Sequence, residues 1–143
     1  MTSFTRTGDK AYDYWLIDGS ATLGFIPGGI IATHENPIPI WLHVGNPAWG
    51  EVHVQGKHGN WLASNQSTVI ALVYEKLSQK GSIYCSEDTN KIKISLRLTP
   101  TSIMILTLQQ RPQLHFSITS LYPHPARIDG EVIGKYPGRI LYP

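Results

Sequence analysis

A series of short apolar segments between residues 82 and 122 constrains the fold more than any other feature of this chain. In KIKISLRL (91–98), isoleucine and leucine alternate strictly with lysine, serine and arginine. A repeat of two places successive side chains on opposite faces of a β-strand, so one face of this strand is apolar. The segments SIYC (82–85), SIMILTL (102–108) and LHFSITSLY (114–122) lie on either side, with turns between them. The series predicts a four-stranded antiparallel meander.

One segment has a helical repeat. In SNQSTVIALVYEKLSQKG (64–81), the apolar side chains recur at the spacing that gathers them on one face of a helix. Ser64 or Ser67 can cap the first turn, and Gly81 stands where a helix-ending glycine is common. The segment just before it, EVHV (51–54), alternates like a short strand and leads into a polar loop. We therefore expect one main helix, beginning near residue 64.

The part of the chain before residue 50 has no helical repeat. Its segment PIPIWLHV (37–44) alternates apolar side chains and starts with prolines, which is typical of an edge strand. The fold class that we predict is α+β, with one main helix packed on a four-stranded antiparallel sheet. It forms a single domain (1–143), comprising a β-rich irregular N-terminal extension (1–49), a core (50–125) and a C-terminal tail (126–143).

Composition excludes several classes of protein. The formal charge of +2 and the pI near 8.7 are compatible with a nucleic-acid ligand but do not require one. A single cysteine, Cys85, rules out an internal disulfide and a cysteine-rich zinc module. No segment approaches the roughly 18 apolar residues of a membrane span, and the N-terminus lacks a signal-peptide core. We therefore expect delivery to another cell, if it occurs, to depend on a larger secreted protein.

The familiar catalytic motifs are missing from the sequence. There is no Gly-x-Ser-x-Gly elbow and no phosphate-binding loop of the Walker type. The histidines at positions 34, 43, 53 and 58 lack the spacing of common metal ligands, so a histidine-ligated metal centre is a weak alternative.

A set of polar residues without metal ligands remains. His53, Lys57 and His58 precede the helix, and a strand rich in hydroxyl groups (117–122) ends the meander. RNA cleavage without a metal needs a base for the ribose 2′-OH, a cation for the phosphate and an acid for the leaving 5′-oxygen. Histidine serves either proton-transfer role near neutral pH, and lysine supplies the cation.

This arrangement resembles a known family. GEVHVQGKHGNWL (50–62), the helix, and HFSITSLYP (115–123) are similar in layout to bacterial toxin nucleases of the barnase/EndoU/colicin/RelE-like superfamily. The superfamily includes contact-dependent inhibition, polymorphic and phage-borne toxin domains. The resemblance covers about residues 50 to 125 and does not extend to residues 1–49.

The resemblance implies a role for each matching residue. His58 would be the first general acid or base, Lys57 the phosphate clamp, and His53 a second acid or base or an orienting residue. Ser117 and Thr119 would position phosphate oxygens. The residues expected to contact RNA are Arg111, Arg97, Lys93, Tyr122 and Trp61.

The resemblance thus predicts a metal-independent endoribonuclease toxin that needs no cofactor and acts in the cytoplasm. Its substrate would be tRNA or another structured RNA, and an acidic immunity protein would be its partner. The alternative is a non-catalytic β-rich binding module with histidines as surface polar groups. The two differ in whether His53 or His58 approaches Ser117 and Thr119.

Overall fold

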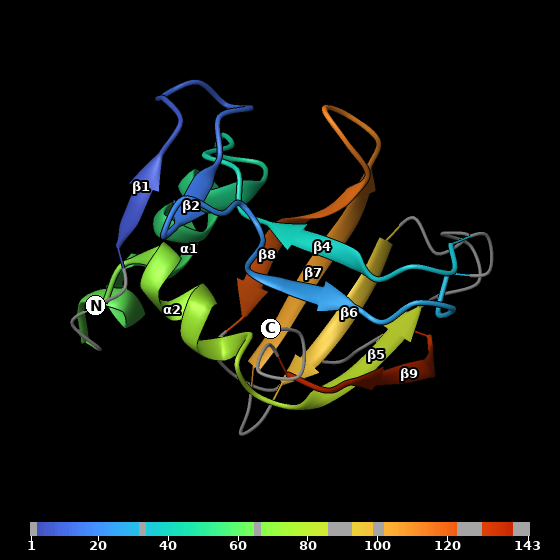
Figure 1. Cartoon of the computed structure of the whole chain (residues 1–143). Helices are drawn as coiled ribbons and strands as arrows, with labels where there is room; N and C mark the ends of the chain where they lie inside the picture. Colours follow the sequence, from blue (N-terminus) through green and yellow to red (C-terminus); the bar gives the residue numbers. More distant parts are fainter. Residues whose placement is uncertain are drawn as a thin grey trace.

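A computed structural model describes residues 3–31, 34–64, 67–85, 93–98, 102–122 and 130–138. These residues form a seven-stranded sheet, a separate two-stranded sheet and two short helices beside them (Figure 1). The two-stranded sheet pairs β1 (Phe4–Arg6) with β2 (Trp15–Ile17). The seven strands of the larger sheet, in spatial order, are β3 (Gly24–Ile26), β4 (Ile38–Trp41), β8 (His115–Tyr122), β7 (Ser102–Gln109), β6 (Lys93–Leu98), β5 (Gly81–Cys85) and β9 (Glu131–Tyr136).

The predicted fold class is wrong. Strands β5 to β8 pair as antiparallel neighbours, but they form only the middle of a seven-stranded mixed sheet. On one side β4 joins β8 in parallel, with β3 beyond it, and on the other side β9 pairs with β5. The regions predicted as an N-terminal extension and a C-terminal tail therefore both contribute strands to one sheet. Pairing between segments so distant along the chain leaves no local repeat to detect.

The second correction is helix α1 (Gly50–Ser64), which occupies the segment predicted as a short strand and loop. Alternation in EVHV covers only four residues, and a strand would bury Val52 and Val54 on one face, whereas Val54 is buried and Val52 is exposed, as on opposite sides of a helix. The helix starts at Gly50, whose positive φ of 81° suits glycine, and its first amides bond back to the carbonyls of His43 and Val44. These backbone bonds fix α1 to the end of β4.

The predicted helix is shorter than the sequence indicated. Helix α2 spans Val69–Lys76, and Thr68 rather than Ser64 or Ser67 caps it by accepting from the amide of Ala71. Its C-terminal cap is Leu77, and Gly81 already belongs to β5. Four of its apolar side chains enter the main core. Two short helices thus replace the single main helix.

The seven-stranded sheet has one core face and one polar face. On the core face, Ile94 and Leu96 of β6, Leu106 of β7 and Phe116 of β8 are almost fully buried. Residues that alternate with these point the opposite way. Throughout, "polar face" means the side of the sheet formed by Lys93, Ser95, Arg97, Ile103, Ile105, Thr107, Ser117, Thr119, Ser120 and Tyr122.

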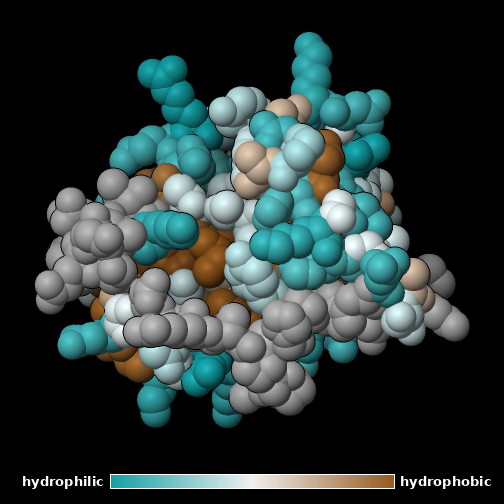
Figure 2. Space-filling view, turned by 180° about the vertical axis from the view of Figure 1, so that it is seen from behind, coloured by the Kyte–Doolittle hydropathy of each residue, from teal (hydrophilic) through white to brown (hydrophobic). Residues whose placement is uncertain are grey.

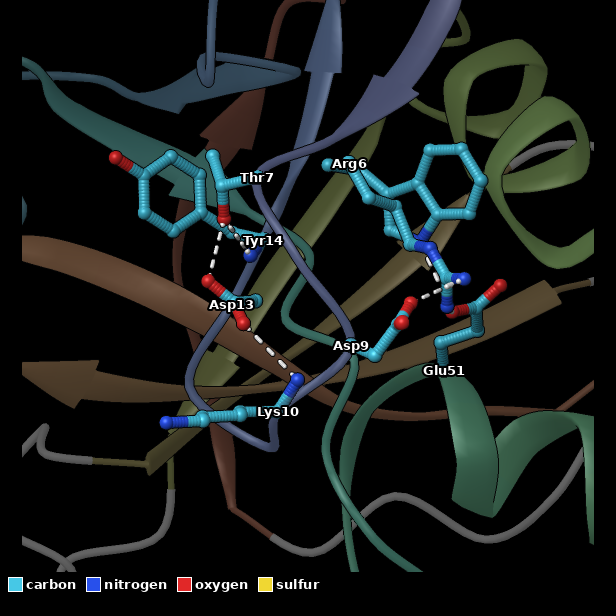
Figure 3. A network of polar contacts seen from close by, with 8 residues as sticks. Arg6, Thr7, Asp9, Lys10, Asp13, Tyr14 and Glu51 are labelled. Carbon is cyan, nitrogen blue, oxygen red and sulfur yellow. Dashed lines mark hydrogen bonds and ion pairs between the residues drawn. The ribbon is translucent and has the colours of Figure 1, made fainter.

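The β1–β2 hairpin is tied to the start of α1 (Figure 3). Glu51 accepts a 2.9 Å hydrogen bond from the Trp15 indole and lies 3.7 Å from the Arg6 guanidinium. Inside the hairpin loop, the Asp13 carboxylate accepts from the Lys10 amide and the Thr7 hydroxyl. The Lys10 amide first, and then the Thr7 hydroxyl, lower the pKa of Asp13. Polar contacts thus hold the hairpin loop, and the hairpin docks both through Glu51 and through backbone hydrogen bonds between residues 11–15 and residues 42–45.

Seen from behind, hydrophilic side chains cover much of the described surface, with a hydrophobic area visible between them (Figure 2). Neither α1 nor α2 has the length and apolar character required to cross a membrane. Of the large apolar side chains in the described part of the chain, Tyr12, Val52 and Val132 are markedly exposed.

Candidate functional site

Helix α1 lies against the C-terminal half of β8, and His53 is the polar contact between them. Its Nε2 atom is 3.3 Å from the Ser120 hydroxyl, and its Nδ1 atom is 2.8 Å from the carbonyl oxygen of Pro47. A carbonyl only accepts, so Nδ1 carries the proton and donates it to Pro47. The Nε2 lone pair then accepts from Ser120. In the neutral form of the ring this tautomer directs the Nε2 lone pair toward the Ser120 hydroxyl.

Lys57 and His58 meet β8 at its last residue, Tyr122. The Lys57 ammonium lies 5.0 Å from the centre of the Tyr122 ring, within the range of a cation–π contact. The His58 ring stands edge-on to the same ring, with centroids 5.8 Å apart. His53 and Lys57 are four residues apart on α1 and share a helix face. Three residues predicted from the sequence, His53, Lys57 and His58, therefore contact the C-terminal half of β8.

A local change in helix geometry sets the position of His58. Its φ of −125° and ψ of 25° are not helical, and they mark a kink inside α1. Two glycines, Gly56 and Gly59, flank this point, and glycine weakens a helix interior by about 1 kcal/mol relative to alanine. The kink lets His58 reach Tyr122, although it immediately follows Lys57.

The register of the sheet places two more cations on the polar face. Tyr122 pairs with Ile103, and Ile103 pairs with Arg97, so these three side chains form one row across β8, β7 and β6. Two strand spacings make the backbone distance from Tyr122 to Arg97 about 10 Å. Lys93 is exposed in the row that also contains Thr107 and Ser117. Arg97 therefore lies within reach of a ligand bound at Tyr122, with Lys93 farther along the same strand.

The predicted hydroxyl residues take other positions. Ser117 is 2% exposed, and its hydroxyl has no hydrogen-bond partner among the described residues. Thr119 is half-buried and shares a 2.8 Å hydrogen bond with Thr107 of β7. The hydroxyl that faces His53 belongs to Ser120, which is 4% exposed. The prediction from the sequence named Ser117 and Thr119 and did not include Ser120.

A β-bulge explains this shift. Ile105 of β7 pairs with Ser120, but the next residue, Leu106, pairs with Ile118, so Thr119 is an extra residue in the ladder. Strict alternation from Ser117 would turn Ser120 and Tyr122 toward the core. The inserted Thr119 returns both to the polar face. No short-range sequence signal marks this position, because the bulge contains neither glycine nor proline.

Of the remaining predicted RNA contacts, Arg111 lies away from the α1–β8 site. It is exposed on the β7–β8 connection, just before β8 begins. Tyr122 ends this eight-residue strand, so Arg111 lies at the opposite end, about 25 Å away along the sheet. Trp61 belongs to α1, and its side chain falls outside the described part of the structure.

The described residues contain no cluster of three or more histidine, cysteine, aspartate or glutamate side chains arranged to hold a metal ion. The charged groups of the α1–β8 site are the cations Lys57 and Arg97. Glu51, in the first turn of α1, is engaged with Trp15 and Arg6 at the hairpin. The site is thus suited to an anionic ligand and to proton transfer by histidine.

Comparison with known proteins gives no relative from which a role could be transferred. No protein-family model, no curated protein and no solved structure matches this chain.

Proposed function

We propose that this protein is a metal-independent endoribonuclease whose active site lies between α1 and the end of β8. One observation carries the proposal: His53, Lys57 and His58 of α1 converge on Ser120 and Tyr122 of β8. Two histidines and a lysine supply a base, an acid and a phosphate clamp, which together suffice for transphosphorylation.

His53 is the general base in this proposal. Its Nδ1–H bond to Pro47 holds the ring with the Nε2 lone pair toward Ser120. A ribose 2′-OH that takes the place of the Ser120 hydroxyl would donate its proton to the same lone pair. The 2′-oxygen then attacks phosphorus, and the bond from phosphorus to the 5′-oxygen breaks. The products are a 2′,3′-cyclic phosphate and a 5′-hydroxyl.

His58 is the general acid, and Lys57 stabilises charge on the phosphate. Both contact Tyr122, so the reacting phosphate would lie beside that ring. His58 in its protonated form gives a proton to the departing 5′-oxygen. Lys57 balances the negative charge that develops on the phosphate oxygens, and Arg97 holds the backbone of a neighbouring nucleotide. No step needs a cofactor.

The substrate that we propose is tRNA or another structured RNA cut in an unpaired segment, since in-line attack needs a nucleotide free of helical stacking. Such an enzyme acts in the cytoplasm, where its substrate is. A cell that makes it needs an immunity protein, and an acidic partner would complement Lys57, Lys93 and Arg97. Delivery as part of a larger secreted protein belongs to the same proposal.

The test is cleavage of end-labelled tRNA and unstructured RNA by the purified chain in excess EDTA. We expect discrete fragments with 2′,3′-cyclic phosphate ends, a large loss of rate in His53→Ala and in His58→Ala, and an unchanged rate in His34→Ala. Circular dichroism checks that each variant is folded. RNA binding without cleavage would overturn the enzyme proposal in favour of a non-catalytic binding module.

A further inference from the structure

A second histidine pair lies buried at the other end of β8. His43 follows β4, and His115 is the first residue of β8. Their Nε2 atoms are 2.9 Å apart, and the side chains are only 2% and 0% exposed. The site predicted from the sequence did not include this pair, whose members are 72 positions apart.

The hydrogen bonds around the pair require one proton more than two neutral rings hold. His43 Nδ1 lies 3.0 Å from the Tyr12 carbonyl, and His115 Nδ1 lies 2.8 Å from the Gln113 carbonyl. A carbonyl accepts only, so both Nδ1 atoms must carry a proton. The contact between the Nε2 atoms needs a third proton, whereas two neutral imidazoles have only two. In a neutral pair, one of the three contacts would set a lone pair against a lone pair.

A proton fits between the rings better than a metal ion does. Two imidazole nitrogens bound to one tetrahedral zinc at about 2.0–2.1 Å lie roughly 3.3 Å apart, which exceeds the observed separation of 2.9 Å. The described residues also supply no third metal ligand beside the pair. The short separation is that of a hydrogen bond.

Aromatic rings surround the pair and favour a cation there. Trp41 stacks on His115 with ring centroids 4.2 Å apart, while the rings of Tyr14 and Trp49 are steeply inclined to His43, with centroids 5.9 and 5.6 Å away. The face of the stacked Trp41 ring attracts positive charge. The two tyrosines, Tyr12 and Tyr14, are the titratable side chains in contact with the pair from the hairpin.

The carboxylate nearest along the chain does not neutralise the pair. The Asp13 side chain is engaged with Lys10 and Thr7 (Figure 3). Burial lowers the pKa of both His43 and His115, and the neighbouring His115 lowers the pKa of His43 further. These effects oppose a second proton on the pair. They also oppose the first, but the first proton completes the hydrogen bond between the rings.

The pair links the two elements that carry the α1–β8 site. The backbone carbonyl of His43 accepts from the Glu51 amide at the start of α1. His115 begins β8, the strand that presents Ser120 and Tyr122 to α1. A change in the contact between His43 and His115 therefore shifts the start of α1 relative to β8, and with it His53 relative to Ser120.

We propose that His43 and His115 share a single proton between their Nε2 atoms, and that this pair is a positioning device for the α1–β8 site. The positioning role rests on the proposed function, whereas the shared proton does not. Loss of the proton at alkaline pH removes the attraction between the rings and loosens the start of α1 from β8.

Nuclear magnetic resonance on the full chain with ¹⁵N-labelled histidine tests the shared proton, without any assay of activity. At neutral pH we expect both Nδ1 atoms of the pair to be protonated and a third proton, far downfield, to belong to the Nε2 atoms. A ring of the pair with an unprotonated Nδ1 would overturn the shared proton. This readout stands even if the chain cleaves no RNA.

The positioning role is tested by His115→Gln, whose amide N–H can donate to His43 Nε2 without any additional proton. The pH profile of RNA cleavage by the parent chain should fall on the alkaline side with the loss of two protons, one from the general acid His58 and one from the pair. His115→Gln should keep only the part of this fall that His58 causes, so its alkaline limb should be less steep, and the matched control His34→Gln should have the limb of the parent. An alkaline limb that is unchanged in His115→Gln, together with a shared proton in the spectra, would overturn the positioning role alone.

Discussion

The Nε2 atom of His53 accepts a hydrogen bond from the hydroxyl of Ser120, although the two residues are 67 positions apart in the chain. The distance of 3.3 Å is long for a bond of this type, so the hydroxyl holds the ring only loosely. The contact assigns different roles to the two residues, with His53 as the base and Ser120 as its partner in the absence of substrate.

The first prediction separates these roles. His53→Ala removes the base, and loss of general base catalysis lowers a rate by roughly 10²–10⁴-fold. Ser120→Ala leaves the imidazole in place through its bond to Pro47, so we expect less than about a tenfold loss of rate. Single-turnover cleavage of labelled RNA by both variants measures the difference. Equal losses in the two variants would contradict the assignment of His53 as the base.

The second prediction concerns Lys57. Its ammonium lies over the Tyr122 ring, where it would meet a phosphate. Removing a group that stabilises charge in the transition state costs roughly 10²–10³-fold in rate. Lys57→Ala should show a loss in this range, and Lys57→Arg should restore part of the rate. Because Lys57→Ala removes one cation that binds phosphate, it should also reduce the slope of binding affinity against salt by roughly 0.7–0.9.

Lys80 provides the matched control for this prediction, because it lies near the start of β5 and outside the α1–β8 site. Lys80→Ala changes the net charge by the same amount as Lys57→Ala. If both variants lose the same fraction of activity, general attraction for RNA explains the effect, and Lys57 has no specific role.

Some elements of this structure could be predicted from the sequence and others could not, for reasons that differ from element to element. The alternation in β6 is strict, so its position and its buried face followed directly from residues 93–98. In α1, the valines at positions 52 and 54 made a strand the more natural interpretation. The segment forms a helix because Val54 and Leu62 are buried against other elements of the fold. Local preference yielded to tertiary packing there.

The candidate site was found in part because its helix residues are neighbours in sequence. His53, Lys57 and His58 were predicted together, and the structure places all three against β8. The partners predicted on β8 were wrong, because the bulge at Thr119 turns Ser120 toward His53 in place of Ser117 and Thr119. The pair of His43 and His115 depends on the parallel pairing of β4 with β8, which no local pattern reveals.

The third prediction concerns the hydrogen bond that joins the end of β9 to the residue after α2. Tyr136, the last residue of β9, is 1% exposed, and its hydroxyl donates to the carbonyl of Leu77 just after α2. Tyr136→Phe removes this hydrogen bond and keeps the ring, so we expect a loss of about 0.5–1.5 kcal/mol in the free energy of unfolding. Urea denaturation measures the loss. A variant as stable as the parent would show that this hydrogen bond contributes little in solution.

The fourth prediction is acid destabilisation, as the pair of His43 and His115 is forced to take up a second proton. Burial lowers the pKa of both rings and opposes the second proton in particular, because the first proton already completes the hydrogen bond between the rings. In the unfolded chain the two rings are separate, so the unfolded chain binds the second proton more readily at acid pH. The corresponding stability is present above about pH 6.5 and is lost as the pH falls and the folded pair takes up the second proton.

Urea denaturation between pH 7 and pH 4.5 checks this direction. The parent chain should lose stability as the pH falls, and the double variant His43→Gln/His115→Gln should lose less over the same interval, because both buried titrating rings are gone. His34→Gln, which leaves the buried pair intact, should follow the parent chain. If the double variant and the parent have the same dependence on pH, the acid sensitivity arises from other groups and the buried pair does not contribute to it.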